Sequence, residues 1–201
     1  EPKSTTILLP EQVWNDPKMI TSILANLYDR LPNHSSIHNG WQNFAAYDEG
    51  MSAVSADLDA GNNNIVQYGY NRWTLWNYDF IRDANLCLEG IDEYSTVLTE
   101  AVKTQFKAEF RFLRAYNYLE LVKRMGGVPI ITEQLIYDYS GDATDLRNKR
   151  NKEHEVYDFI ASECDAIKDI VGNTGSKDRA NKYAVLALKS RAMLYAGSIA
   201  K

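Results

Sequence analysis

The sequence predicts an all-α protein, a stack of helical hairpins interrupted by one long loop that is rich in aromatic residues. Five segments place apolar residues three and four positions apart, which is the spacing of one face of an α-helix. The last segment also carries alanines at regular intervals, and small residues let packed helices approach closely. With 201 residues, of which 45% are hydrophobic, the chain can bury a sizeable core as one domain.

The first predicted helix begins at Pro17 and ends before Pro32. Asn15 and Asp16 supply a cap, and the fixed φ of Pro17 suits a first helical turn. The apolar face of this helix consists of Ile20, Ile23, Leu24, Leu27, Tyr28 and Leu31.

The second predicted helix begins at Trp73, and its helical spacing continues through Trp76 and Phe80 to Ile91. Between the two helices, residues 32–73 are rich in Asn, Gly, Ser and Asp and follow no periodic pattern. A loop of this length inside a compact domain is usually functional or disordered. Its aromatic residues favour an ordered, functional loop.

A third helix is expected over residues 98–124, and two glycines end it. The extended residues 128–132 follow, and then a polar connection that reaches Arg150. Asn151 is expected to cap a fourth long helix, which stops at Gly172.

The fifth predicted helix begins at Asp178, and its residues 187–197 resemble the first helix of a tetratricopeptide hairpin. Its small residues are Ala180, Ala184, Ala187, Ala192 and Ala196. The expected fold is therefore an all-α stack of tetratricopeptide-like hairpins with one long aromatic loop. The second helix of the last hairpin would lie past Lys201, so we expect an incomplete protein with an exposed apolar face.

Charge and cysteine content argue against several classes of protein. A net charge of −5 disfavours a nucleic-acid partner, because such proteins neutralise phosphates with a surplus of Lys and Arg. Cys87 and Cys164 lie far apart and in no metal-ligand spacing, so neither a disulfide framework nor a zinc site is expected. No run of about twenty apolar residues is present to span a bilayer. The polar residues 1–6 resemble a processed N-terminus.

Four motifs resemble catalytic or metal sites but fail on spacing or context. His34 and His38 have zinc spacing, but no Glu follows the first His. Residues 57–62 resemble a calcium loop whose glycine comes one position early, and residues 172–177 resemble a phosphate loop that is one residue short. The adjacent carboxylates at 48–49 are of a kind commoner on surfaces than in glycosidase sites. We therefore expect no catalytic residue, no metal and no cofactor.

The aromatic loop contains the predicted ligand site. Flat rings cover the apolar faces of sugars, while Asp, Asn and Arg side chains exchange hydrogen bonds with hydroxyl groups. The predicted ligand-binding residues are Trp41, Asp48, Tyr70, Arg72 and Trp73. Trp73 is the leading candidate because it stands where the loop meets a helix, which would hold its ring in place. The opposing interpretation is that Trp73 begins the buried stripe of the second helix.

Three segments, in this order, resemble the SusD/RagB family of nutrient-binding outer-membrane lipoproteins. The first is residues 76–85. The strongest is residues 108–129, where a Phe-Leu-Arg-Ala-Tyr helix leads to a Gly-Gly-Val-Pro exit. The third joins residues 155–160 to residues 179–197. Residues 162–164 depart from the family pattern, and we expect this departure to affect packing but not the family assignment.

The resemblance implies a non-catalytic protein that binds oligosaccharides or polysaccharides on the outer membrane of a Gram-negative, Bacteroidetes-type bacterium. Residues 1–201 would be its N-terminal SusD-like helical region, anchored to the membrane through a lipidated Cys upstream of Glu1. The implied partner is a SusC-type, TonB-dependent transporter. A RagB-like peptide-binding protein, a protein-interaction scaffold and, less favoured, a glycoside hydrolase are the alternatives.

The resemblance also bears on a basic stripe along the third predicted helix. Lys103, Lys107, Arg111 and Arg114 share one helix face, which by itself would suit an anionic partner. The family pattern implies instead that Arg111 and Arg114 form ion pairs within the protein.

Overall fold

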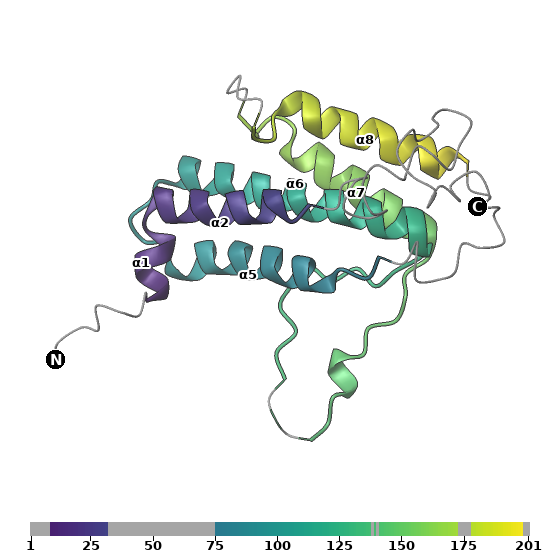
Figure 1. Cartoon of the computed structure of the whole chain (residues 1–201), viewed down its shortest axis with the longest axis horizontal. Coiled ribbons are helices and arrows are strands. Elements are labelled where there is room, and N and C mark those ends of the chain that lie inside the picture. Colours follow the sequence, from purple (N-terminus) through teal and green to yellow (C-terminus); the bar gives the residue numbers. More distant parts are fainter. Residues whose placement is uncertain (1–8, 32–74, 138, 140, 173–177, 199–201) are drawn as a thin grey trace, which may run out of the picture. The chain divides into compact units, whose positions relative to one another are not determined.

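The computed structural model describes residues 9–31, 75–137, 139, 141–172 and 178–198 of the chain. The chain divides into two units, one formed by Glu1–Arg30 with Asn77–Lys201 and the other by Leu31–Trp76. All helices of the described part belong to the first unit (Figure 1). Within the described residues every regular element is helical, which confirms the predicted all-α class.

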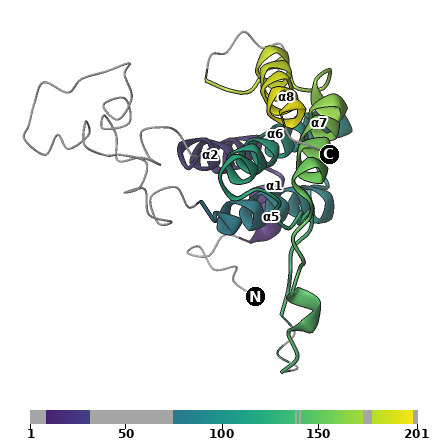
Figure 2. The ribbon, with the colours of Figure 1, turned by 90° about the vertical axis from the view of Figure 1, so that its right-hand side faces the viewer.

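One long central helix, α6, organises the first unit. The helices are α1 (Pro10–Trp14), α2 (Pro17–Asp29), α5 (Tyr78–Tyr94), α6 (Glu100–Met125), α7 (Glu153–Ile167) and α8 (Lys182–Gly197), with a short 3-10 turn, η3, at Thr144–Leu146. Helix α6 packs against α2, α5, α7 and α8, and α7 also packs against α8 (Figures 1 and 2). From α5 onwards each helix thus packs against the next one, as expected for stacked hairpins.

The burial pattern explains why α6 lies at the centre. Unlike a surface helix with one apolar stripe, α6 buries residues on several faces, among them Phe110, Leu113, Tyr118 and Leu121. Among the described residues, no helix is both long enough and apolar enough for a bilayer crossing.

Helix α5 starts at Tyr78, five residues later than its predicted start at Trp73. Residues 75–77 are not helical, and the Asn77 side chain accepts a hydrogen bond from the backbone N–H of Phe80 at 3.3 Å. Asparagine favours this cap position because its side chain satisfies an N–H group that the helix leaves without a partner. Trp76 is therefore not part of the helix, and 49% of its surface is exposed.

Two later boundaries also differ from the prediction. Helix α7 begins at Glu153 after the cap residue Lys152, and the cap predicted at Asn151 is wrong because its side chain accepts from Ile130 N–H at 2.9 Å. The helix ends at Ile167 instead of Gly172. A turn follows, in which Ile167 C=O accepts from the backbone N–H groups of Ile170 and Val171 at 2.9 Å.

Helix α8 begins at Lys182 instead of Asp178, because the Asn181 side chain caps it by accepting from Ala184 N–H at 3.0 Å. The residues before this cap contact other helices. The backbone N–H of Ala180 donates to the Tyr28 hydroxyl at 2.7 Å, and that hydroxyl donates to Glu109 at 3.2 Å. Glu109 also pairs with Arg179. This cluster holds the segment before α8 against α2 and α6.

Two short elements escaped prediction because they are too short to show a helical period. One is η3. The other is α1, which is held in place by the residue that follows it. The Asn15 side chain donates to Tyr94 C=O and accepts from the backbone N–H groups of Thr96 and Val97, at 2.8–2.9 Å.

Two glycines end α6 for different physical reasons. Gly126 has a φ of 68°, in the left-handed region that favours glycine. Gly127 lies against the start of α7, where a Cβ would overlap the carbonyl oxygen of Asn151 and come within 3.1 Å of Glu153 N. The predicted glycine exit from this helix is confirmed.

We expect Gly127→Ala to lower the free energy of unfolding by about 1–3 kcal/mol, because the overlapping atoms belong to the backbone and have little freedom to move. Urea denaturation measures the change. Gly197→Ala is the matched control, since a Cβ there meets nothing within 4 Å and alanine is the better helix former. Equal stability of the two variants would contradict this account.

Candidate functional site

The predicted ligand residues Trp41, Asp48, Tyr70, Arg72 and Trp73 lie outside the described residues. The same holds for the histidine pair and for residues 57–62, which were weighed as metal motifs. The site predicted in the aromatic loop therefore stays a prediction.

An ion pair joins α2 and α5, the helices that precede and follow residues Leu31–Trp76 in the chain; we call these residues the inserted unit. Arg30 at the end of α2 pairs with Asp83 on α5 at 2.7 Å, and its guanidinium lies 5.7 Å from the centre of the Phe80 ring. The ion pair therefore connects the end of α2 to the first turns of α5. Burying the Phe80 ring beneath the guanidinium adds an attractive cation–π contact.

A segment without regular structure, residues 128–135, runs along α5 and α6, and we call it the strap. Side chains from the helices satisfy its backbone groups. Asn85 donates to Ile131 C=O at 3.2 Å and to Glu133 C=O at 3.0 Å, and Glu89 accepts from Gln134 N–H at 2.7 Å. These bonds replace the partners that a helix or sheet would supply, so the strap keeps a defined position.

A second set of contacts fixes the middle of the strap. The Tyr118 hydroxyl accepts from Ile131 N–H at 2.7 Å and donates to Ile131 C=O at 3.2 Å. Tyr118 is fully buried, and its ring meets Phe159 edge-on at 5.3 Å. Burial raises the pKa of Tyr118 to about 12, so the hydroxyl keeps its proton and remains a donor.

A buried ionic cluster contacts the strap through Arg114. Glu163 accepts from Arg111 at 2.7 and 3.1 Å and from Arg114 at 3.0 Å. Arg114 also donates to Asn85 at 2.7 Å and to Thr132 C=O at 3.1 Å. The cluster thus links α7, α6 and α5 to the strap. The ion pairs predicted for Arg111 and Arg114 are confirmed.

Glu163 lies within the segment that departs from the family pattern, and it has an electrostatic role as well as a packing one. It is 8% exposed and is the common anionic partner of two arginines. Burial by itself raises the pKa of Glu163, but the hydrogen bonds and positive charges of Arg111 and Arg114 outweigh this effect and hold the pKa below its usual value.

The other two members of the basic stripe are paired as well. Lys103 binds Glu100 at 2.8 Å, and Lys107 binds Asp92 at 2.7 Å. The stripe therefore consists of ion-paired side chains, which weakens the case for an anionic partner at this face.

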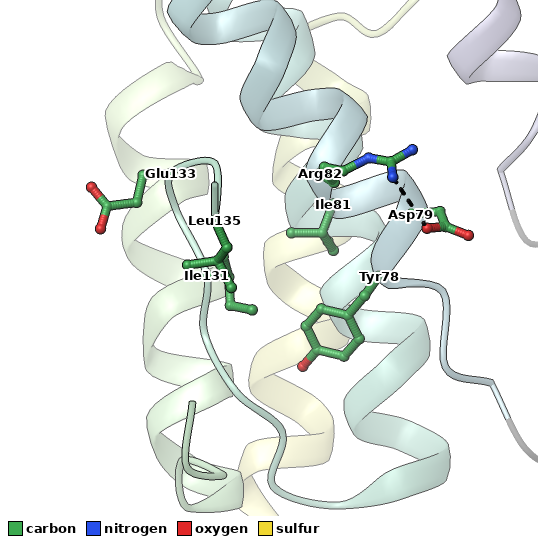
Figure 3. Close-up of a pocket in the computed structure, with 7 residues that line it drawn as sticks. All are labelled: Tyr78, Asp79, Ile81, Arg82, Ile131, Glu133 and Leu135. Carbon is green, nitrogen blue, oxygen red and sulfur yellow. Dashed lines mark ion pairs between the residues drawn. The ribbon is translucent and has the colours of Figure 1, made fainter. Parts of the chain in front are cut away.

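The strap and the first turns of α5 enclose a surface pocket of about 200 Å³ (Figure 3). Its lining residues are Tyr78, Asp79, Ile81, Arg82, Ile131, Glu133 and Leu135. In Figure 3, Ile131 and Leu135 of the strap face Ile81 and Tyr78 of α5, while the charged groups lie at the outer edges. An apolar floor with a polar rim is the usual composition of a small-molecule site.

The Tyr78 ring is held by its own hydroxyl, which donates to Pro129 C=O at 2.7 Å. Burial raises the pKa of Tyr78, so this hydroxyl stays protonated and the bond persists across the physiological range. At the rim, Arg82 pairs with Asp79 at 3.8 Å and with Asp83 at 3.2 Å. The pocket thus offers a fixed ring, aliphatic surface and carboxylates.

Sequence reasoning did not identify this pocket. Tyr78, Asp79 and Arg82 stand within the segment that carried the family resemblance, but Glu133 and Leu135 come some fifty residues later, and no sequence pattern pairs the two segments. Among the residues that the structure describes, no group of three or more His, Cys, Asp or Glu side chains is placed to hold a metal ion.

Comparison with known protein families identifies one match. A SusD-like sequence family described as "Starch-binding associating with outer membrane" matches residues 2–194. SusD-like protein P38 of Formosa agariphila is 27% identical over 200 residues, which make up 97% of this chain and 38% of that protein.

Solved structures agree with this match. A SusD-like protein from Bacteroides fragilis has a TM-score of 0.63 and 27% identity, covering 91% of this chain and 36% of that one. A SusD-like carbohydrate-binding protein from the same species has a TM-score of 0.58 and 20% identity over 90% of this chain and 38% of that one, which establishes the shared fold. The predicted tetratricopeptide-like architecture is confirmed. The chain spans less than half the length of these relatives.

Proposed function

Because the chain belongs to the SusD-like family, we propose that the full-length protein captures glycans at the outer membrane without cleaving them. The match over residues 2–194 is the observation that carries this proposal. The description of the family as starch-binding supports glycans over peptides as the ligand class. It also supports an outer-membrane location.

We propose the aromatic loop as the main ligand surface, with Trp41, Asp48, Tyr70, Arg72 and Trp73 as contacts. Rings would cover the apolar faces of the sugar units, and the charged side chains would bind their hydroxyls. The helical body supports this role, because α2 and α5 on either side of the inserted unit are joined by the Arg30–Asp83 ion pair.

The proposed route passes captured glycans to a SusC-type, TonB-dependent transporter, with a lipidated Cys upstream of Glu1 as the membrane anchor. A single acyl chain binds membranes only marginally, so contact with the transporter would strengthen retention. Co-purification of the tagged full-length protein from outer membranes tests both points. Recovery of the protein alone in the soluble fraction would contradict them.

We propose that residues 1–201 form the N-terminal helical region of a longer protein. The relatives that match it are more than twice as long. Helix α8 supports the same view, because it buries Val185, Leu188 and Ala192 on one side while Tyr183 and Leu194 are 69% and 76% exposed. A helix that is apolar on opposite sides is usually covered on both, and a further helix of the same protein fits this face.

We expect Trp73→Ala to abolish glycan binding by the full-length protein while the melting temperature stays unchanged. An array of starch-derived, plant, host and microbial glycans, with peptides as the control class, selects the ligand for calorimetry. Fluorescently labelled oligosaccharides test for turnover, and we expect none. A loss of about 3–5 kcal/mol of stability with retained binding would show that the ring belongs to the core. Binding of peptides alone would overturn the glycan proposal.

A further inference from the structure

We propose that the pocket between α5 and the strap is a subsite for one neutral sugar unit and that it disfavours uronic acid and sulfated units. This inference rests on the proposed glycan-binding function and assigns a place and a charge preference to part of it. The described residues that line the pocket all lie in the helical unit, and none of them belongs to the ligand site predicted in the aromatic loop.

The size of the pocket suits a single ring. Its volume of about 200 Å³ is below the range of about 300–1,000 Å³ that is typical for sites of drug-sized ligands. The pocket is also open to the surface, so neighbouring units of a chain are free to extend beyond it. A terminal or internal sugar of a longer glycan therefore fits better than a compact multi-ring ligand.

The floor of the pocket matches the apolar face of a pyranose. Ile81, Ile131 and Leu135 form an aliphatic floor, and the Tyr78 ring adds an aromatic wall. These groups suit the apolar C–H face of a sugar ring. The carboxylates of Asp79 and Glu133 lie at the outer edges of the pocket and point away from its floor, so they set the charge around the pocket.

The charges at the rim set the preference for neutral sugars. Two acidic residues and one basic residue line the pocket, Asp79 and Glu133 against Arg82, for a net formal charge of −1. The single positive group is engaged by two carboxylates, Asp79 at 3.8 Å and Asp83 at 3.2 Å. A carboxylate or sulfate on the ligand would meet like charges, and that juxtaposition is unfavourable.

Hydrogen bonds hold both walls of the pocket in place. Asn85, Glu89 and Tyr118 hold the strap at three of its residues, and the Tyr78 hydroxyl is bonded to Pro129. Binding would therefore order few side chains, which limits the entropic cost of binding a neutral sugar unit.

The test uses the full-length protein with labelled isoleucine and leucine methyl groups, observed by NMR together with calorimetry. The neutral probes are maltohexaose, cellohexaose, laminarihexaose and β-1,4-mannohexaose. The anionic probe is β-1,4-hexamannuronate, which differs from the last of these by a carboxylate in place of each hydroxymethyl group. We expect at least one neutral probe to shift the methyl signals of Ile81, Ile131 and Leu135, and the anionic probe to shift none.

The outcomes separate this inference from the proposed function. Calorimetric binding of a neutral probe without shifts at these three residues overturns the subsite and leaves glycan binding standing. Shifts caused by hexamannuronate overturn the charge preference. Absence of binding by all neutral probes overturns the subsite, and a glycan array without any binding overturns the proposed function as well.

Matched variants on the strap sharpen the test. Leu135→Gln removes aliphatic surface from the floor without adding charge, and we expect about tenfold weaker binding of the neutral probe. Ile136→Gln makes a comparable change at the next residue, which is 76% exposed and does not line the pocket, and affinity should change less than twofold. Equal effects of the two variants would overturn the subsite. Melting temperatures confirm that both variants fold.

Discussion

Glu163→Gln is expected to lower the free energy of unfolding by about 3–5 kcal/mol, because it leaves the buried guanidinium of Arg114 without its anionic partner. Arg114 is only 5% exposed, so water cannot replace the lost carboxylate. The amide of glutamine accepts fewer and weaker hydrogen bonds than a carboxylate that serves two arginines. Urea denaturation measures the loss of stability, with the same slope of unfolding free energy against urea concentration used for both proteins.

An exposed ion pair provides the control for this variant. Asp92→Asn removes the partner of Lys107, whose side chain is 33% exposed while that of Asp92 is 62% exposed, and should cost less than about 1 kcal/mol. The double variant Arg114→Met, Glu163→Leu should recover part of the loss, since it removes both buried charges together. A loss for Glu163→Gln no larger than for Asp92→Asn would contradict the role of the cluster.

Asn85→Leu is expected to cost about 2–4 kcal/mol and to loosen the strap. The substitution removes a hydrogen bond to the charged Arg114 and both hydrogen bonds to strap carbonyl groups. Arg114 keeps Glu163 and Thr132, and Ile131 C=O keeps Tyr118, so the loss is smaller than that of the ionic partner. Denaturation measures the stability.

Hydrogen exchange reports the second effect of Asn85→Leu. The amide protons of Ile131 and Gln134, which are bonded to Tyr118 and Glu89, should exchange faster when the strap loosens. Asn148→Leu is the control. The hydrogen bond that the structure assigns to the Asn148 side chain is local and exposed, and it goes to Leu146 C=O. Unchanged exchange at the strap would show that Asn85 is not its main anchor.

Periodicity was sufficient to predict the long helices because each has an apolar face that repeats every three or four residues. It failed where local bonds set the boundary. Helix α5 starts at Tyr78 because Asn77 caps it, although Trp73 and Trp76 continue the same spacing upstream. Helix α8 starts at Lys182 because the Asn181 side chain caps it, accepting from Ala184 N–H at 3.0 Å.

The family resemblance was also readable from sequence, since residues 108–129 combine a helix and an exit of unusual composition. The match over residues 2–194 confirms it. The ligand site in the aromatic loop remains a prediction, because its residues lie outside those that the structure describes. For the loop, composition indicates a type of ligand but specifies no geometry.

The sequence by itself thus determined the helical class, the approximate extent of each long helix and the family, all of which depend on local spacing or on contiguous motifs. The tertiary structure alone decided which charges meet and which surfaces form a pocket. Glu163 stands 49 residues from Arg114, and Leu135 of the strap lies opposite Ile81 of α5. Such contacts depend on how α5, α6 and α7 pack, and a helical period records which face of a helix is apolar but not which helix will cover it.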